Sequence, residues 1–148
     1  LLESTLIVLR SNLKDQAVVE ANMGEELPLV SCQPGRLNQV FMNIITNAAQ
    51  SMEATGLSIE ERIVEISSSQ VESIGQSWIE VRIKDRGIGM SEAVKSQIFD
   101  PFFTTKSVGE GTGLGLSIVM GILSDHNAEV EVETEEGIGT EFIIRFPL

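Results

Sequence analysis

Residues 78–89 read WIEVRIKDRGIG, and this stretch says most about the fold. Apolar and charged side chains alternate from Trp78 to Lys84, which is typical of a β-strand with one buried and one exposed face. Asp85 follows directly, and Gly87 and Gly89 then permit a tight turn. The pattern predicts a half-covered sheet with a carboxylate at the end of one strand, above an open stretch of backbone.

The segments around this strand predict an α+β fold. Apolar residues at helical spacing favour helices at 1–13, 34–52 and 116–125, the last after a loop at 109–115, and Ser91 is suited to cap a short helix that contains Val94 and Ile98. Strands are expected at 62–67, 130–134 and 140–146, with short extended pieces within 17–30. Together these elements predict a two-layer sandwich, in which a mixed, mainly antiparallel sheet carries helices on one face.

The length of 148 residues matches one domain, which begins with the predicted helix at 1–13. Leu2, Leu6, Leu9 and Leu13 form an apolar face whose partner could lie outside this chain. The sequence begins at Leu1 and not at methionine, so we expect a fragment of a longer protein. No apolar run approaches the roughly 20 residues of a membrane span.

The charge of the chain excludes some partners. The chain holds 22 Asp and Glu against 10 Lys and Arg, a formal charge of −12, so we expect neither nucleic acid nor an anionic membrane as a partner. Taken alone, this charge also disfavours ATP. Residues 82–106 differ, because five basic and three acidic side chains leave +2 there. One cysteine excludes an intrachain disulfide, and one cysteine with one histidine is too few for a zinc site.

The helix predicted between Leu37 and Met52 has no charged side chain, and one stripe of it carries amides: Gln39, Asn43, Asn47 and Gln50. An ordinary solvated face is the simpler explanation, although such faces usually use Lys and Glu. Each asparagine also lowers helix stability by roughly 0.5–0.7 kcal/mol relative to alanine. A carboxamide offers an oxygen to a hard cation and an NH₂ group to a phosphate oxygen, so the stripe suits Mg²⁺ with a polyphosphate.

Two glycine-containing stretches also suit the binding of a phosphate-containing ligand such as a nucleotide. Asp85 can accept a hydrogen bond from an amine such as adenine N6, and its glycines let a flat ring approach the main chain; a solvated aspartate in an ordinary turn is the alternative. Gly109–Leu116 has four alternating glycines before a helix, which suits a phosphate cradle of unpaired N–H groups. This second stretch lacks the residues of a P-loop and the spacing of a dinucleotide fingerprint.

Three of the six phenylalanines, Phe99, Phe102 and Phe103, lie within residues 99–103. They could form a small satellite core under a loop. Alternatively, they could form an aromatic hinge for a mobile segment whose Lys106 reaches phosphate.

In their order and spacing, these stretches resemble the ATP-binding catalytic domain of sensor histidine kinases. The resemblance covers residue 15 to the end and rests on five motifs: NIITNA at 43–48, DRGIG at 85–89, FDPFF at 99–103, GTGLG at 111–115, and GIGT at 137–140 with Phe142. It implies the Bergerat ATP-binding fold, which gyrase, MutL-type and heat-shock chaperone ATPases share. Residues 15–148 are then expected to be the catalytic domain, and residues 1–14 the end of an upstream helical region for dimerisation and phosphoacceptance.

The resemblance also implies roles for single residues. Asn43 would bind Mg²⁺, Asn47 would contact phosphate, and Asp85 would bind adenine N6. The segment from Phe102 to Gly113 would close over ATP, and Asn43 and Lys106 would be the catalytic residues. The residues implied to contact ATP are Asn43, Asn47, Gln50, Asp85, Gly87, Gly89, Phe102, Lys106, Gly111, Thr112, Gly113, Leu114, Gly115, Leu116 and Thr140.

The implied activity is transfer of the γ-phosphoryl group of Mg-ATP to a histidine on a separate dimerisation domain of the same protein. A response regulator would act downstream. The location would be cytoplasmic, as a soluble protein or as the cytoplasmic part of a membrane-bound sensor. The isolated domain is expected to be a monomer without direct membrane contact. Hydrolytic relatives carry glutamate at position 43, and an amide cannot take a proton from water, which favours transfer.

Two alternatives stay open: a non-catalytic nucleotide-binding module and a protein-serine kinase of the same fold. Gln50 also departs from the resemblance, because the family often has a basic residue there. The only histidine, His126, lies at a predicted helix end, where we expect it to interact with the helix dipole and not to accept phosphate.

Overall fold

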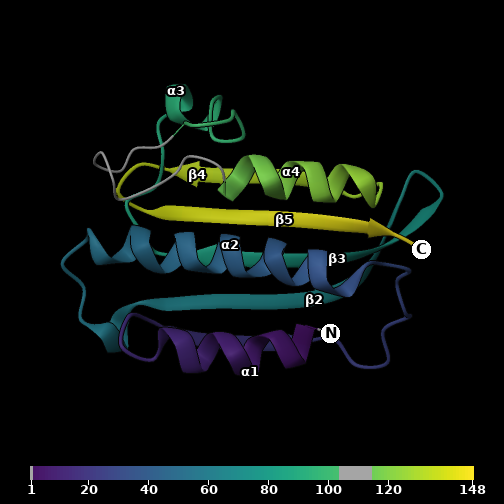
Figure 1. The fold of residues 1–148 in the computed structure, drawn as a ribbon, viewed down its shortest axis with the longest axis horizontal. Helices are drawn as coiled ribbons and strands as arrows, with labels where there is room; N and C mark the ends of the chain where they lie inside the picture. The colour runs from purple at the N-terminus through teal and green to yellow at the C-terminus, as the bar shows by residue number, and fades with distance from the viewer. Residues whose placement is uncertain (1, 104–114) are drawn as a thin grey trace.

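The computed structural model describes residues 2–103 and 115–148, and these form one sheet with helices packed on one face (Figure 1). The strands are β1 (Val18–Met23), β2 (Ile63–Ser73), β3 (Gln76–Asp85), β4 (Glu129–Glu135) and β5 (Gly139–Pro147). Their order across the sheet is β1-β2-β3-β5-β4. Only the β1–β2 pair is parallel among the described strand pairs, so the predicted mixed, mainly antiparallel α+β fold is confirmed.

Three helices lie side by side along the strands: α1 (Leu2–Leu13), α2 (Pro34–Glu53) and α4 (Gly115–Asp125) (Figure 1). Two shorter pieces, η1 (Ile59–Glu61) and α3 (Glu92–Lys95), connect the larger elements. Pro34 begins α2, where its missing N–H would have no helical partner in any case. As predicted, Ser91 caps α3, since its hydroxyl accepts a hydrogen bond from the Val94 N–H.

The apolar side of α1 finds its partner inside the chain. Leu6, Leu9 and Leu13 are buried in the core that α2 and the sheet also form. The Thr5 hydroxyl donates a hydrogen bond to the Asn38 carboxamide oxygen of α2. Helix α1 is therefore packed as part of this unit, and the assignment of residues 1–14 to an upstream region stays a prediction.

Strands β2 and β3 extend further than the sequence pattern indicates. The prediction ended the first strand at 67, whereas β2 continues to Ser73 and forms a hairpin with β3 through Ile74 and Gly75, both at positive φ. The extra residues include Ser68, Ser69 and Gln70, which show no apolar alternation because this end of the strand buries little surface. Pairing with β3, and not burial, keeps them extended.

His126 joins the end of α4 to the start of α2. Its Nε2 accepts a hydrogen bond from the Gln33 N–H at 3.0 Å, and its Nδ1 donates to the Ile122 carbonyl at 2.8 Å. The Arg36–Asp125 ion pair, with 2.7 Å between Nη2 and Oδ2, links the same two helix ends. The predicted interaction of His126 with the helix dipole is thus only part of its role. Both nitrogens of its ring take part in the hydrogen bonds described above.

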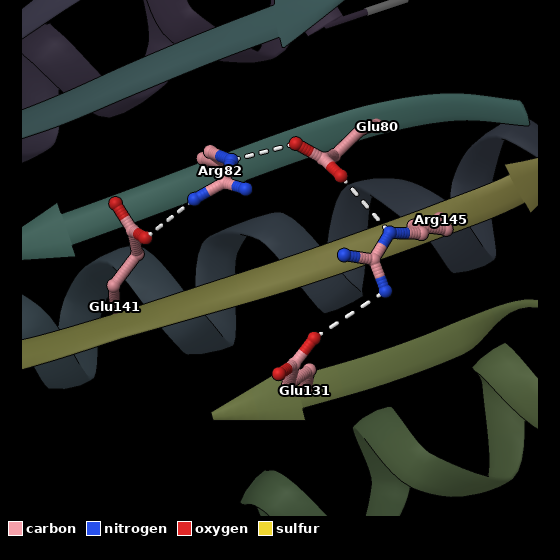
Figure 2. Close-up of polar contacts among 5 residues, drawn as sticks. All are labelled: Glu80, Arg82, Glu131, Glu141 and Arg145. Carbon is pink, nitrogen blue, oxygen red and sulfur yellow. Dashed lines mark hydrogen bonds and ion pairs between the residues drawn. The ribbon is translucent and has the colours of Figure 1, made fainter. Parts of the chain in front are cut away.

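The sheet face opposite α1, α2 and α4 carries a connected set of ion pairs (Figure 2). Glu80 contacts Arg82 at 2.6 Å and Arg145 at 2.9 Å; Arg82 also contacts Glu141 at 2.8 Å, and Arg145 contacts Glu131 at 3.4 Å. We call these five residues the outer-face network.

The outer-face network surrounds Ile143, which is 0% exposed although it faces away from the helices. Arg82 and Glu131 are its cross-strand neighbours, and Glu141 and Arg145 lie two residues away along β5. The aliphatic parts of these side chains cover the isoleucine while their charged ends pair above it. Burial by itself raises the pKa of Glu80, but the hydrogen bonds and charges of Arg82 and Arg145 outweigh it and hold that pKa below its ordinary value.

Candidate functional site

The candidate site lies where the end of β3, the end of α2 and the β4–β5 turn meet. Asp85 is the last residue of β3 and is only 5% exposed. Strand alternation places its side chain on the helical face, with Ile83 and Val81. The Gly87 N–H donates a hydrogen bond to Asp85 Oδ1 at 2.8 Å, so the turn that follows the strand holds the carboxylate in place.

Burial changes the acidity of this carboxylate. It raises the pKa of Asp85 to about 6, and hydrogen bonds from the backbone of Gly87 and Thr140 reduce that effect. An ionised carboxylate in such surroundings is a strong acceptor, because few water molecules compete for it. The site therefore offers one buried acceptor that gains a proton in mildly acidic solution.

Close contacts within the protein leave no room for a side chain at Gly87 or Gly89. A Cβ atom on Gly87 would lie 2.0 Å from the Ser51 hydroxyl oxygen, and one on Gly89 would lie 2.0 Å from the Glu135 carbonyl oxygen. Gly89 also has a φ of 68°, in the left-handed region. The structure thus explains both glycines by close packing against α2 and β4, and their role in admitting an adenine ring stays a prediction.

Gly89→Ala is expected to destabilise the protein by about 2–5 kcal/mol, the sum of a left-handed alanine and a clash with backbone. The β4–β5 turn would have to move, which breaks the hydrogen bond from the Gly137 N–H to the Ile88 carbonyl, 2.8 Å in length. Urea denaturation measures this loss.

Gly137→Ala is the matched control for that substitution. Gly137 has a φ of 80°, and a Cβ atom placed on it would meet no other atom within 4 Å, so only the conformational cost of about 1–2 kcal/mol applies. Equal losses in the two variants would contradict the tight approach of Gly89 to β4.

Two hydroxyl groups that the sequence interpretation missed hold the turn after Asp85. Ser51 Oγ accepts a hydrogen bond from the Ile88 N–H at 3.1 Å, and Thr134 Oγ1 accepts one from the Met90 N–H at 2.9 Å. Thr134 Oγ1 also lies 2.9 Å from Thr140 Oγ1. Weak signals existed: Ser51 follows Asn47 by one helical turn, and Thr134 directly faces Thr140 in the hairpin.

The amide stripe of α2 faces the start of α4. Asn43 Nδ2 donates a hydrogen bond to the Gly115 carbonyl at 3.1 Å. Asn43, Asn47 and Gln50 are all half-buried, unlike the exposed Gln39. Because a carbonyl can only accept, the Asn43 amide is oriented with its NH₂ group toward Gly115; its oxygen is of the kind that can bind a hard cation. The structure thus brings Asn43 close to Gly115, the first residue of α4, and Leu116 follows it in that helix.

Other predicted ligand residues fall outside the described part of the chain. These are Lys106, Gly111, Thr112, Gly113 and Leu114. Just before that segment, Phe99 and Phe103 pack against the core, whereas Phe102 is 74% exposed with a φ of 66°. Phe99 and Phe103 thus belong to the edge of the main core and not to a separate satellite core, and the aromatic hinge stays a prediction.

The net charge of +2 over residues 82–106 does not form one positive surface beside Asp85. Arg82 points to the opposite face of the sheet from Asp85 and is paired with Glu80 and Glu141. Arg86 is paired with Glu65 at 3.4 Å. Alternation along a strand sends consecutive side chains to opposite faces, so a charge sum over neighbours in sequence mixes two surfaces.

Comparison with known proteins agrees with this arrangement. Residues 32–148 match the family described as histidine kinase-, DNA gyrase B-, and HSP90-like ATPase. Sporulation kinase E of Bacillus subtilis is 35% identical over 130 residues, which are 88% of this chain and 16% of that protein. Sensor histidine kinase ZraS of Escherichia coli is 32% identical over 124 residues, 84% of this chain and 24% of that protein. The chain thus spans less than a quarter of the length of either relative.

Solved structures resemble the chain over nearly its full length. The catalytic domain of histidine kinase ThkA has a TM-score of 0.76 and 31% identity, and the match covers 98% of this chain and 88% of that one. Full-length ShkA in complex with AMPPNP has a TM-score of 0.77 at 25% identity, and the match covers 99% of this chain and 30% of that one.

Proposed function

Because this chain belongs to the histidine kinase-, DNA gyrase B- and HSP90-like ATPase family, as the ATP-binding catalytic domain of a sensor histidine kinase, we propose that it transfers phosphate to a histidine. The substrate is Mg-ATP, and the acceptor lies on a separate helical dimerisation domain of the same protein. A response regulator receives the phosphoryl group afterwards, in the cytoplasm. No helix within the described residues is long and apolar enough to cross a membrane.

The observation that carries this proposal is the buried Asp85 carboxylate at the end of β3. It is held by the Gly87 N–H at 2.8 Å and lies beside the end of α2. Adenine presents an amine, N6, from which this carboxylate can accept a hydrogen bond, whereas guanine presents a carbonyl oxygen at the same ring position. Asp85 therefore selects adenine, and Thr140 supports it from β5 through its backbone.

Helix α2 extends from the base site toward the phosphates. Asn43 and Asn47 lie one turn apart on the same stripe, and Asn43 reaches the beginning of α4. The N-terminus of an α-helix favours an anion, because its first backbone N–H groups have no partner within the helix. In this arrangement Asn47 and Gln50 bind phosphate oxygens, while Gly115 and Leu116 supply backbone N–H groups near the same end.

The residues present fit a magnesium ion held through the Asn43 oxygen. Asn43 Nδ2 contacts Gly115, so the Asn43 oxygen would hold the ion together with oxygens of ATP, and Mg²⁺ prefers such oxygen ligands. When bound, the ion neutralises charge on the triphosphate. Asn43 orients the phosphates but takes no proton from water, so the site favours transfer to a protein side chain over hydrolysis.

Phosphotransfer is tested with the helical dimerisation domain of the same full-length protein as acceptor and ATP labelled at the γ-phosphate. We expect label on the acceptor that is labile in acid and stable in alkali. Asp85→Ala should retain the fold, as judged by circular dichroism, and abolish labelling at moderate ATP concentration.

Other outcomes of this experiment decide against the proposal. Measurable ATP binding without any label on the acceptor would establish a non-catalytic nucleotide-binding module. Label that survives acid and is lost in alkali would establish a serine or threonine acceptor. Unchanged labelling by Asp85→Ala would remove Asp85 from the site.

A further inference from the structure

Ser51 lies against the turn that carries the base-recognition carboxylate. It is half-buried on α2, one helical turn after Asn47. A single point, the Cβ position of a side chain at 87, lies 2.0 Å from Ser51 Oγ and 2.9 Å from Asp85 Oδ1. The hydroxyl and the carboxylate are therefore close neighbours, separated only by the space that Gly87 leaves open.

The backbone after Asp85 is pinned by a series of hydrogen bonds. The Gly87 N–H points to Asp85, and the next N–H, that of Ile88, points to Ser51. Glycine has few steric restrictions of its own, so bonds to the adjacent peptide units must determine the shape of this turn. Without them the Gly87 N–H can rotate away from Asp85.

Besides the bond to Asp85, three hydrogen bonds among the described residues connect residues 87–90 to other elements, and they differ in what they connect. The Met90 N–H is held by Thr134 of β4, and the Ile88 carbonyl accepts from Gly137 in the β4–β5 turn. Both contacts connect the turn to the hairpin. The Ser51 bond instead joins the turn to α2, the helix of Asn43 and Asn47.

We infer that Ser51 is a positioning residue, which fixes the Asp85–Ile88 turn to α2 so that the adenine acceptor and the phosphate-binding amides keep one spacing. This inference rests on the proposed function of the site. Ser51 acts through the turn and needs no contact with the nucleotide. Through the hydrogen bond of Ser51 to Ile88, recognition of the base depends on α2, the helix that binds the phosphates.

If Ser51 had a purely structural role, removing its hydroxyl would lower the stability of the protein. Little stability depends on this hydrogen bond, however. Ile88 is 47% exposed, so water can replace the hydroxyl as acceptor for its N–H. Removing the hydroxyl should therefore change the stability of the protein slightly and the precision of base recognition more.

The test compares Ser51→Ala with the shape-matched pair Ser51→Thr and Ser51→Val, of which only threonine keeps the hydroxyl. Affinities are measured calorimetrically for ATP, for GTP and for inorganic tripolyphosphate, each with Mg²⁺. For Ser51→Ala and Ser51→Val we expect ATP affinity to fall about 3- to 10-fold, the range of one neutral hydrogen bond, and tripolyphosphate affinity to stay unchanged. The preference for ATP over GTP should fall by a similar factor, and Ser51→Thr should retain it.

Ser58→Ala is the control, since it removes an exposed hydroxyl that lies 2.7 Å from Glu61, away from the turn. Equal losses for ATP and tripolyphosphate, or an unchanged ATP-to-GTP preference, would overturn the inference. Wild-type affinity for ATP in Ser51→Val would overturn it as well. If the unmodified protein shows no ATP binding that Asp85→Ala abolishes, the proposed function itself fails, and this outcome is distinct from the three outcomes that overturn the inference alone.

Discussion

Asp85→Asn is expected to change the stability of the ligand-free protein by an amount that depends on pH. Relative to the unmodified protein, the variant is more stable at pH 8 than at pH 4. The folded protein keeps a proton on Asp85 up to a pKa of about 6, whereas the reference carboxyl releases it near 3.8. Between these values the folded state binds more proton, so its stability falls as the pH rises. Above pH 6 the buried charge lowers stability by about 3 kcal/mol, at 1.36 kcal/mol per pKa unit, and asparagine removes this charge.

Asparagine also has one oxygen where aspartate has two, and its neutral amide is a weaker acceptor for the backbone N–H groups of Gly87 and Thr140. This loss is about 1–2 kcal/mol and does not depend on pH. We therefore expect Asp85→Asn to be destabilising at pH 4 and stabilising at pH 8, with the difference changing by about 2–3 kcal/mol between the two. Urea denaturation at a series of pH values measures it, and the titration of every other group cancels in the comparison.

The same substitution is expected to lower ATP affinity by about 10- to 100-fold at pH 8, the range of a hydrogen bond to a charged group. Since adenine N6 prefers the ionised carboxylate, ATP affinity of the unmodified protein should also fall as the pH decreases through about 6. The variant should lack this additional decrease, and the titration of the ATP phosphates is common to both proteins.

Asp15→Asn is a suitable control, because Asp15 is exposed and lies at the end of α1. It should change neither the stability profile nor the ATP affinity. An Asp85→Asn protein whose stability relative to the unmodified protein is the same at pH 4 and pH 8 would contradict the burial of an ionisable group at this position.

Glu80→Ala is expected to destabilise the protein by about 2–3 kcal/mol. Removing one member of a buried ion pair typically costs about 3–5 kcal/mol, and the smaller figure applies because Arg82 and Arg145 keep Glu141 and Glu131. Their side chains are also 40% and 26% exposed, so water compensates part of the loss. The substitution additionally uncovers Ile143. Thermal or urea denaturation at neutral pH measures the effect.

The pH dependence of this variant has the opposite sign to that of Asp85→Asn. The pKa of Glu80 is below its ordinary value of 4.5, so its contribution to stability is present above pH 4.5 and is lost as the pH falls further. The difference between the unmodified protein and Glu80→Ala should therefore shrink in acid. Glu133→Ala, an exposed glutamate that faces Glu141 across the sheet, should change stability by less than about 0.5 kcal/mol. Equal effects of Glu80→Ala and Glu133→Ala would contradict a role of the outer-face network in stability.

The sequence pattern alone does not show that Glu80 and Asp85 are buried. Alternation correctly separates Glu80 from Ile79 and Val81, and it predicts an exposed face for the glutamate. The structure shows Glu80 only 6% exposed, because Arg82 and Arg145 close over it. These two arginines are 63 residues apart in the chain, and only the β3–β5 pairing makes them neighbours.

The sequence by itself determined the elements, the α+β class and the family. These three properties follow from the spacing of apolar residues and from motifs of a few neighbouring positions. Both kinds of pattern depend only on the local geometry of the backbone. The tertiary structure decided the contacts of the site: Ser51 with Ile88, Thr134 with Met90, and the opposite faces of Arg82 and Asp85. Such contacts join residues that share no local pattern, so they exist only once burial of the apolar face has fixed the position of α2 and the hairpin against β3.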